Sequence, residues 1–190
     1  MVFAMTPFQV RRPGQLDERV GAHTPSKLLA IGNEALLSDH KVAFFCSSRC
    51  PGDAILGAYD SARKLRDDGV TVISGFHSPV EKECLRILLR GKQPIIICPA
   101  RALEKFRLPA DWRKALDAGR LLILSPFEKY PRRPTTESAR QRNELVAALS
   151  DDALIIYATP GGSLERLAEL VDRWGIPRRK NKDAKPLNPA

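Results

Sequence analysis

The side chains best suited to chemistry in this chain lie in short turns that follow apolar segments. One turn reads CSSRCPG, in which Ser47 and Ser48 offer hydroxyl groups and Arg49 offers a guanidinium. The planar fork of a guanidinium matches the oxygens of a phosphate. A plain polar loop in which a serine caps a helix is the alternative, but an arginine directly after a buried strand has no obvious packing role. We therefore favour an anion-binding role for this turn.

Two further turns have the composition of phosphate cradles. The first reads GFHSP, where Gly75 allows a close approach of the backbone and His77 can bond a phosphate or a base. The second reads TPGGS, where Gly161 and Gly162 permit the backbone angles of an anion nest and Ser163 begins a helix. The alternatives are a histidine that satisfies a neighbouring backbone group and an ordinary glycine turn.

A longer basic segment reads PFEKYPRRPTTESARQRN. It contains Arg132, Arg133 and Arg142, with Asn143 at its end and Tyr130 interleaved among the charges. Basic side chains can follow the phosphates of a single strand while aromatic rings stack on its bases. The alternative is a solvated charge run on an exposed loop. We interpret the segment as an extension of a nucleic-acid track.

Motifs for several other chemistries are missing from the sequence. No G-x-G-x-x-G follows a strand, and the P-loop spacing of Gly52 and Gly57 is followed by Ala58 and Tyr59 where Lys and Ser or Thr are required. The three histidines do not combine into a Ser-His-Asp arrangement. The sequence therefore predicts neither a complete catalytic site nor a cofactor.

The four cysteines, Cys46, Cys50, Cys84 and Cys98, contain no C-x-x-C pair. Zinc sites commonly depend on such a spacing, so we expect small buried side chains with reduced thiols and no metal site. The N-terminal residues also lack the basic start and apolar stretch of a secretory signal. Together these features predict a cytoplasmic protein.

Length and composition fit one compact domain with short additions. The chain has 190 residues, of which 43% are hydrophobic, and this content excludes wholesale disorder. No apolar run approaches the roughly 20 residues that span a bilayer, so no membrane association is expected. The net charge is +9, and the segment from Arg178 onward carries +4 of it. Such a charge favours polyanions, although tuning for solubility is an equal alternative.

The elements that would position these turns alternate along the chain. We expect strands at residues 42–46, 70–74, 94–98, 121–125 and 153–158, and helices at residues 52–68, 79–90, 109–118, 135–149 and 162–174. Ser78, Pro79 and Glu81 have the spacing of an N-cap, a first-turn proline and a capping box. Near-continuous apolar strands separated by helices predict an α/β fold with a mainly parallel sheet of five or more strands between two helical layers. The order of the strands stays open.

Three parts of the chain are expected. Residues 1–37 form a preface that packs on or beside the domain and contains a short helix at residues 26–31. Residues 38–176 form the domain, and residues 177–190 form a basic, disordered tail. Ligands of open parallel sheets bind at the carboxyl ends of the strands, where helix N-termini attract anions. The turns named above should therefore share one rim.

These turns also resemble those of the DNA-processing protein A (DprA/Smf) family. SSR resembles the family's Gly-Ser-Arg, VISGFHSPVEKECLRILLRGKQPIII resembles its VVSGLA-GID-AAH block, QRNELVAALSDDALIIYA resembles its RN-x-I-I-x-x-L-S segment, and GGSL resembles its S-G-S-L turn. The resemblance covers residues 36–176 and implies a Rossmann-like domain in a compact, divergent member. It also implies a nucleic-acid or anion pocket that contains Arg49, Gly75, Arg142, Asn143, Gly162 and Ser163.

The leading functional hypothesis follows from this resemblance and from the basic charge. It is a single-stranded DNA-binding protein that acts in DNA uptake, transformation or recombination. The resemblance further implies a homodimer and a RecA-type recombinase as a partner. A small-molecule nucleotide sensor that uses the same pocket is the alternative, with His77 and Cys98 in contact with a base or ribose.

A nucleotide phosphoribohydrolase is a third, weaker hypothesis. The PGGS turn resembles the P-G-G-x-G-T-x-x-E turn of the lysine-decarboxylase-like phosphoribohydrolases. Leu164 and Ala168, however, occupy the positions where that turn needs Gly and Glu. Glu81 or Glu83 would then have to serve as the acid/base group.

Overall fold

One mixed sheet forms the centre of the computed structural model, which describes residues 6–180. Within those residues the sheet has seven strands in the order β1-β2-β6-β5-β4-β3-β7. Their bounds are Phe8–Val10 (β1), Leu28–Gly32 (β2), Lys41–Cys46 (β3), Thr71–Ser74 (β4), Ile95–Ile97 (β5), Leu121–Ser125 (β6) and Asp152–Tyr157 (β7). The five strands from β6 to β7 are parallel, whereas β1 and β2 run antiparallel to their neighbours. The prediction of a mainly parallel sheet of five or more strands is confirmed.

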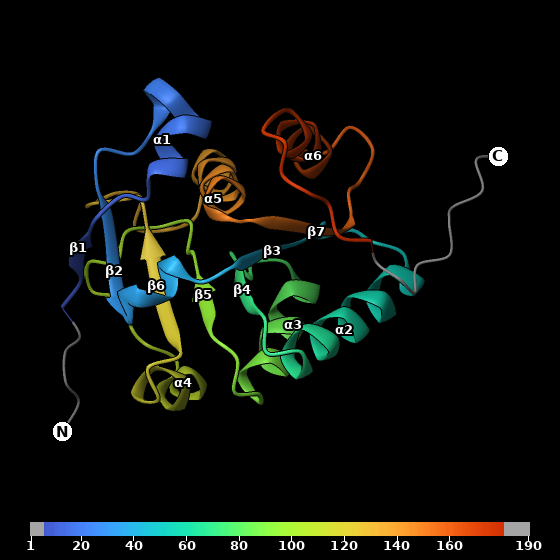
Figure 1. The fold of residues 1–190 in the computed structure, drawn as a ribbon, viewed down its shortest axis with the longest axis horizontal. Helices are drawn as coiled ribbons and strands as arrows, with labels where there is room; N and C mark the ends of the chain where they lie inside the picture. Colours follow the sequence, from blue (N-terminus) through green and yellow to red (C-terminus); the bar gives the residue numbers. More distant parts are fainter. Residues whose placement is uncertain (1–5, 181–190) are drawn as a thin grey trace.

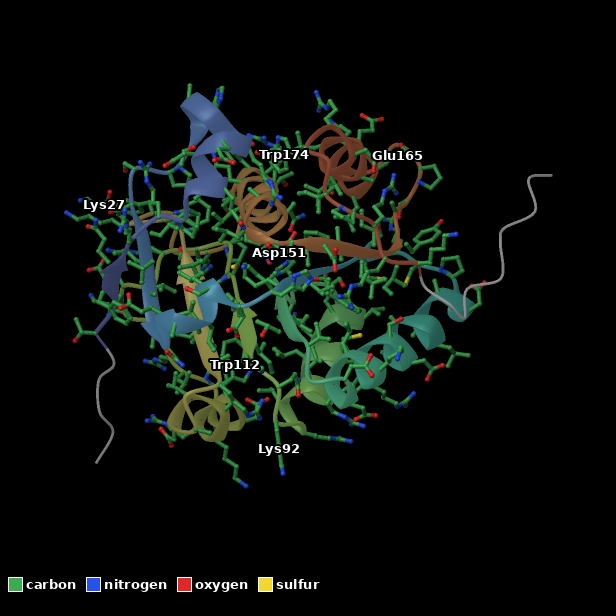
Figure 2. All side chains as sticks on the ribbon, in the orientation of Figure 1. Lys27, Lys92, Trp112, Asp151, Glu165 and Trp174 are labelled. Atoms are coloured by element: carbon green, nitrogen blue, oxygen red, sulfur yellow. The ribbon has the colours of Figure 1, made fainter. Side chains whose placement is uncertain are left out.

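Helices cover both faces of this sheet (Figure 1). The helices are α1 (Gly14–Val20), α2 (Gly52–Asp67), α3 (Pro79–Leu89), α4 (Arg113–Asp117), α5 (Thr136–Leu149) and α6 (Ser163–Arg173). One apolar core lies between the sheet and α2, α3 and α4, and a second lies between the sheet and α1, α5 and α6. Figure 2 shows Trp112 on the side of α4, and Glu165 and Trp174 on the side of α6. The predicted three-layer α/β/α arrangement is confirmed.

The apolar strands have the composition that burial on both faces requires. In β3, the side chain of Phe44 joins the core beneath α2 and α3, while those of Ala43 and Phe45 join the core beneath α5 and α6. All three residues are at most 1% exposed. Because successive side chains of a strand point to opposite faces, a strand between two helical layers contains an uninterrupted apolar run.

The helix boundaries follow from local capping. The side chain of Ser78 accepts a hydrogen bond from the amide of Glu81, and the Glu81 carboxylate accepts one from the amide of Ser78, which completes the predicted capping box of α3. A second capping box, between Thr135 and Ser138, begins α5. The helix expected at residues 109–118 is less regular, since a 3₁₀ turn at Ala110–Trp112 precedes the five residues of α4.

The preface corrects one prediction. Residues 26–31 were expected to form a short helix, but Leu28–Gly32 is strand β2. The segment LLAIG is too short for its pattern to separate a helix from a strand, and pairing with β6 decides the outcome. The preface also packs α1 on α5, where the side chains of Gln15 and Arg19 donate to the carbonyls of Leu149 and Ala148 at the end of the helix.

The beginning of the basic tail corrects another prediction. The amide of Ala153 in β7 donates to the carbonyl of Pro177 at 2.9 Å, and the amide of Arg179 donates to the carbonyl of Ala153 at 2.9 Å. Arg178 pairs with Asp172, and Arg179 pairs with the first residue of β7. Residues 177–179 are therefore held against the sheet, because backbone pairing and two ion pairs replace the expected disorder. Residues 181–190 of the predicted tail lie outside the described residues.

The strand order identifies a switch point. Strands β3 and β7 are adjacent and parallel, yet α2 follows β3 on one face of the sheet and α6 follows β7 on the other. The loops after these two strands therefore diverge and leave a crevice at the carboxyl edge. In open α/β sheets this is the place where ligands bind.

Candidate functional site

A pocket of about 330 Å³ occupies the crevice between β3 and β7. We call it the switch-point pocket, and its walls come from the loops after β3, β4 and β7 and from α5. It is lined by Cys46, Ser47, Ser48, Arg49, His77, Ser78, Glu81, Ala139, Arg142, Asn143, Thr159, Gly162, Ser163 and Leu164. The loops after three predicted strands thus meet at one rim, and eight of the twelve predicted site residues line a single cavity.

The loops after β3 and β7 are tied together by Thr159. Its amide donates to Oγ of Ser47 at 3.0 Å, and its hydroxyl donates to the carbonyl of Arg49 at 3.0 Å. The amide of Ser47 donates in turn to the carbonyl of Tyr157. These bonds fix the backbone of Arg49, while its side chain is exposed and has no acidic partner within residues 6–180. The Arg49 guanidinium is thus available to an anion in the pocket.

Arg142 supplies a second guanidinium from the middle of α5. The residue is only 4% exposed. Its Nη1 donates to the carbonyl of Cys98 at 3.2 Å, and its Nε donates to Oδ1 of Asn143 at 2.7 Å. Burial lowers the pKa of Arg142, against the opposing effects of Glu81 and Cys98. An arginine nevertheless stays protonated in proteins, so the pocket wall contains a fixed positive charge.

Glu81 is the acidic group of the pocket, and its oxygens are occupied. Oε1 accepts from the amide of Cys46 at 3.0 Å, and Oε2 accepts from the amides of His77 and Ser78 at 2.9 and 3.2 Å. The carboxylate therefore joins the end of β3 to the start of α3. Because all three bonds are structural, Glu81 is poorly placed to act as an acid/base group.

His77 lies at the mouth of the pocket. Burial lowers the pKa of this histidine below its ordinary value of 6.5, and the charges of Arg142 and Lys82 lower it further, whereas Glu81 raises it. The imidazole is therefore mainly neutral near pH 7 and can either donate or accept a hydrogen bond.

The glycine turn after β7 differs in part from the predicted anion nest. Gly161 has a φ of +71°, which only glycine adopts freely, but its amide donates to the carboxylate of Glu165 at 2.7 Å. The amide of Gly162 donates to the carbonyl of Thr159 at 2.9 Å. These two amides are therefore not free for an anion. Helix α6 begins directly afterwards without a side-chain cap, and its first two residues, Ser163 and Leu164, line the pocket.

The structure does not bring Arg132 and Arg133 into the pocket. Both are exposed on the loop before α5. The guanidinium of Arg132 lies 5.5 Å from the ring centre of Tyr130, a side chain that is 70% exposed. From the predicted basic segment Ala139, Arg142 and Asn143 line the cavity, so Arg142 is the cation that the segment contributes to it. Gly75 lies behind Arg142, where the absence of a side chain leaves room for the guanidinium.

A model of the DNA recombination-mediator protein A family matches residues 4–169. The chain belongs to this family. The resemblance drawn from the turns of the sequence is thus confirmed.

Two solved structures of the family have the same fold. DNA processing protein A from Helicobacter pylori, whose structure was described for its single-stranded DNA binding mode, is 25% identical with a TM-score of 0.73, and the match covers 96% of this chain and 85% of that one. DNA processing protein A from Streptococcus pneumoniae is 19% identical with a TM-score of 0.73, and the match covers 93% of this chain and 62% of that one. A comparison with curated proteins finds no match. The Rossmann-like fold is therefore shared with this family.

Sequence reasoning missed Thr159 as a site residue, although it predicted the loop that contains it. The position directly after a buried parallel strand was the available signal.

The four cysteines of this chain are free thiols, and burial raises the pKa of Cys98 to about 12. In the described part of the chain no group of three His, Cys, Asp or Glu side chains is arranged to hold a metal ion. No helix between residues 6 and 180 is long and apolar enough to cross a membrane.

Proposed function

We propose that this chain binds single-stranded DNA, with backbone phosphates held in the switch-point pocket. The observation that supports this most directly is the meeting of two guanidinium groups, those of Arg49 and Arg142, with the uncapped start of α6 in one cavity. Guanidinium forks and helix N-termini are the groups that bind phosphate in proteins. Membership of a recombination-mediator family and the single-stranded DNA binding of the Helicobacter pylori relative agree with this assignment.

Membership of the recombination-mediator family supports a biological setting for the protein. We propose that the protein acts in recombination of incoming DNA, in the cytoplasm, and that it passes bound strands to a RecA-type recombinase. A homodimer is the proposed state, because a dimer would place two pockets on one strand and raise the effective affinity.

The salt dependence of oligonucleotide binding tests the phosphate site. Each single-strand phosphate that is contacted should add about −0.7 to the slope of log K against log salt. Arg49→Ala should weaken binding roughly 10-fold or more and reduce the steepness of the slope by about 0.7, because one charge-assisted phosphate contact is lost. Arg90→Ala is the matched control. Arg90 is also an exposed arginine, but it lies at the C-terminal end of α3, whereas the N-terminal end of that helix borders the pocket.

Two results would contradict the assignment. One is the absence of oligonucleotide binding at low salt. The other is an equal effect of Arg49→Ala and Arg90→Ala, which would indicate only a nonspecific effect of net charge.

A small-molecule nucleotide sensor is the second candidate, and the size of the pocket favours it. A cavity of about 330 Å³ lies at the lower end of the range for small ligands. His77 is available to a base, but Cys98 is fully buried and does not line the cavity. A thermal-shift comparison separates the two functions, because a mononucleotide should stabilise a sensor and an oligonucleotide should not.

The phosphoribohydrolase hypothesis has little support from the geometry. The Glu81 carboxylate is occupied by three backbone amides. Glu83 pairs with Arg86 on the outer surface of α3 and does not line the pocket. Release of a base from nucleoside monophosphates by the purified protein would revive this hypothesis.

A further inference from the structure

A second groove, of about 410 Å³, lies beside the switch-point pocket. It is bordered by the turn after β4 and by the long connection between β5 and β6, and we call it the aromatic groove because Phe76, Phe106 and Trp112 line it. His77 and Arg142 line both cavities. A flexible chain held in one cavity can therefore continue directly into the other.

Two partly exposed rings form one wall of the aromatic groove. The ring centres of Phe106 and Trp112 are 6.1 Å apart and their planes are inclined by 30°. Both rings contact the core beneath α4 but remain half-buried, so each presents part of its surface to the groove. The guanidinium of Arg101 lies 4.8 Å from the ring centre of Phe106. An arginine stacked on an aromatic ring is a platform that suits a planar ligand.

The charge around the rings is mainly positive. Three cations, Arg101, Arg107 and Lys82, line the groove beside Arg142 and beside Arg86, which pairs with Glu83. Asp111 is the acidic side chain of the lining. None of the three cations has an acidic partner within the described residues. The groove thus combines aromatic faces with cations that have no protein counter-charge, which is the composition of single-strand binding surfaces.

The backbone holds this arrangement in place. Within residues 6–180 the two non-glycine residues with positive φ are Phe76 and Lys105, at +46° and +56°; Phe76 lines the groove, and Lys105 directly precedes Phe106, which also lines it. The carbonyl of Arg101 accepts from the hydroxyl of Ser125 at 2.8 Å. The amide of Ala102 donates to the carbonyl of Pro131 at 2.9 Å. Since left-handed backbone is unfavourable for such residues, these contacts must maintain the loop that presents the rings.

We propose that the aromatic groove stacks an unpaired base of the strand whose phosphates occupy the switch-point pocket. The inference rests on the proposed function and adds a base subsite to it. His77 and Arg142 form the boundary that the strand crosses between its phosphate site and its base site. Because every base has an aromatic face, the subsite tolerates all sequences, and it discriminates against duplex DNA, whose bases are already stacked.

Binding of a fluorescent oligodeoxynucleotide to single variants tests the subsite. Trp112→Leu and Phe106→Leu should each lose affinity by roughly 5- to 150-fold, the effect of one lost stacking contact. Phe8→Leu is the matched control, because Phe8 is an exposed aromatic residue of β1 that lines neither the groove nor the switch-point pocket. An oligonucleotide with abasic positions should bind the wild-type protein with a similarly reduced affinity. Trp112→Leu and the wild type should then bind this abasic oligonucleotide equally well.

A second measurement leaves the groove intact and so does not depend on the folding of these variants. The chain has two tryptophans, and Trp174→Phe leaves Trp112 as the fluorophore. Stacking of a base on Trp112 should quench its emission when the normal oligonucleotide is added. The abasic oligonucleotide should leave the emission unchanged.

The outcomes separate the two proposals. If the wild-type protein binds no oligonucleotide at low salt, both proposals are overturned. If Arg49→Ala weakens binding while Trp112→Leu and Phe106→Leu behave like Phe8→Leu and the emission of Trp112 is unchanged, the phosphate site stands and the base subsite is refuted.

Discussion

Gly75 provides the space that the guanidinium of Arg142 occupies. A Cβ atom built on Gly75 would overlap Nη1, Cζ and Nε of Arg142. Gly75 lies at the end of β4 and Arg142 lies in the middle of α5, so the two residues join segments far apart in the chain. The glycine is required here for close approach rather than for an unusual backbone angle.

Gly75→Ala should therefore displace Arg142 from the pocket. We expect oligonucleotide affinity to fall about as far as in Arg142→Ala, and the free energy of unfolding to fall by about 1–3 kcal/mol because the buried bond to Cys98 is lost. Fluorescence anisotropy and urea denaturation measure the two effects. Gly14→Ala is the control, because a Cβ on Gly14 meets nothing within 4 Å. Unchanged binding in Gly75→Ala would contradict the role of Arg142.

The histidine at the pocket mouth predicts a pH dependence of binding. In the free protein the pKa of His77 lies below 6.5, so the side chain is mainly neutral near pH 7. A bound phosphate would favour the imidazolium and raise this pKa, so binding takes up a proton. Affinity should accordingly increase as the pH falls from about 8 to about 5.5.

NMR titration of His77 with and without an oligonucleotide measures this shift directly. His77→Gln should abolish most of the pH dependence, whereas His40→Gln should retain it, because His40 pairs with Asp152 at the other end of the strands. A pKa of His77 that does not rise on binding would exclude contact with phosphate.

Glu81→Gln should destabilise the protein even though the two side chains have the same shape. The carboxylate accepts from three amides, and an NH2 group in place of either oxygen would leave at least one donor unpaired. We expect a loss of about 1–3 kcal/mol in the free energy of unfolding, measured by urea denaturation. Glu83→Gln on the same helix removes only an exposed pair with Arg86 and should cost less than about 1 kcal/mol. Equal stability of the two variants would show that the buried carboxylate contributes nothing.

The contact between α1 and α5 predicts that the preface contributes to stability. The guanidinium of Arg19 donates to the carbonyls of Ala148 and Ser150 at 2.9 and 2.6 Å, where α5 ends. Arg19→Ala should lower the free energy of unfolding by about 1–3 kcal/mol, because charge-assisted bonds to the helix end are lost. Arg11→Ala, at an exposed arginine of the same segment, is the control in a thermal melt. If both variants melt together, the preface is only loosely attached.

The parts of the fold that were predictable depend on local signals. Ser78, Pro79 and Glu81 set the start of α3 within four residues of sequence, and the structure has the capping box there. Strand β2 was not predictable in this way, because its partner β6 lies about 90 residues further along the chain. The apolar run LLAIG alone does not contain that information.

The candidate site was predictable to the extent that topology determines it. Parallel strands place their carboxyl ends at one edge, so Arg49 and His77 were expected to meet there, and they line one pocket. Arg133 belongs to the same basic segment as Arg142, but sequence proximity to a site does not determine the direction of an exposed side chain. The amide of Gly161 is taken by Glu165, a contact that depends on the turn conformation. Phe106 was missed because it lies in an irregular connection without periodicity. Trp112 was missed because its place in the short helix expected at residues 109–118 did not show that its ring borders a groove.

The two outer strands of the sheet differ in how they are shielded. Strand β1 has only three residues and is followed by Arg11 and Arg12, while the outer edge of β7 is covered at Ala153 by the backbone of residues 177–179. Short strands and nearby cations are the devices by which sheets resist edge-to-edge aggregation. Two copies held on one DNA strand, as in the dimer proposed above, would bring such edges close together at high local concentration. The shortness of β1 and the covered edge of β7 would then keep neighbouring copies soluble while they are crowded on the same polymer.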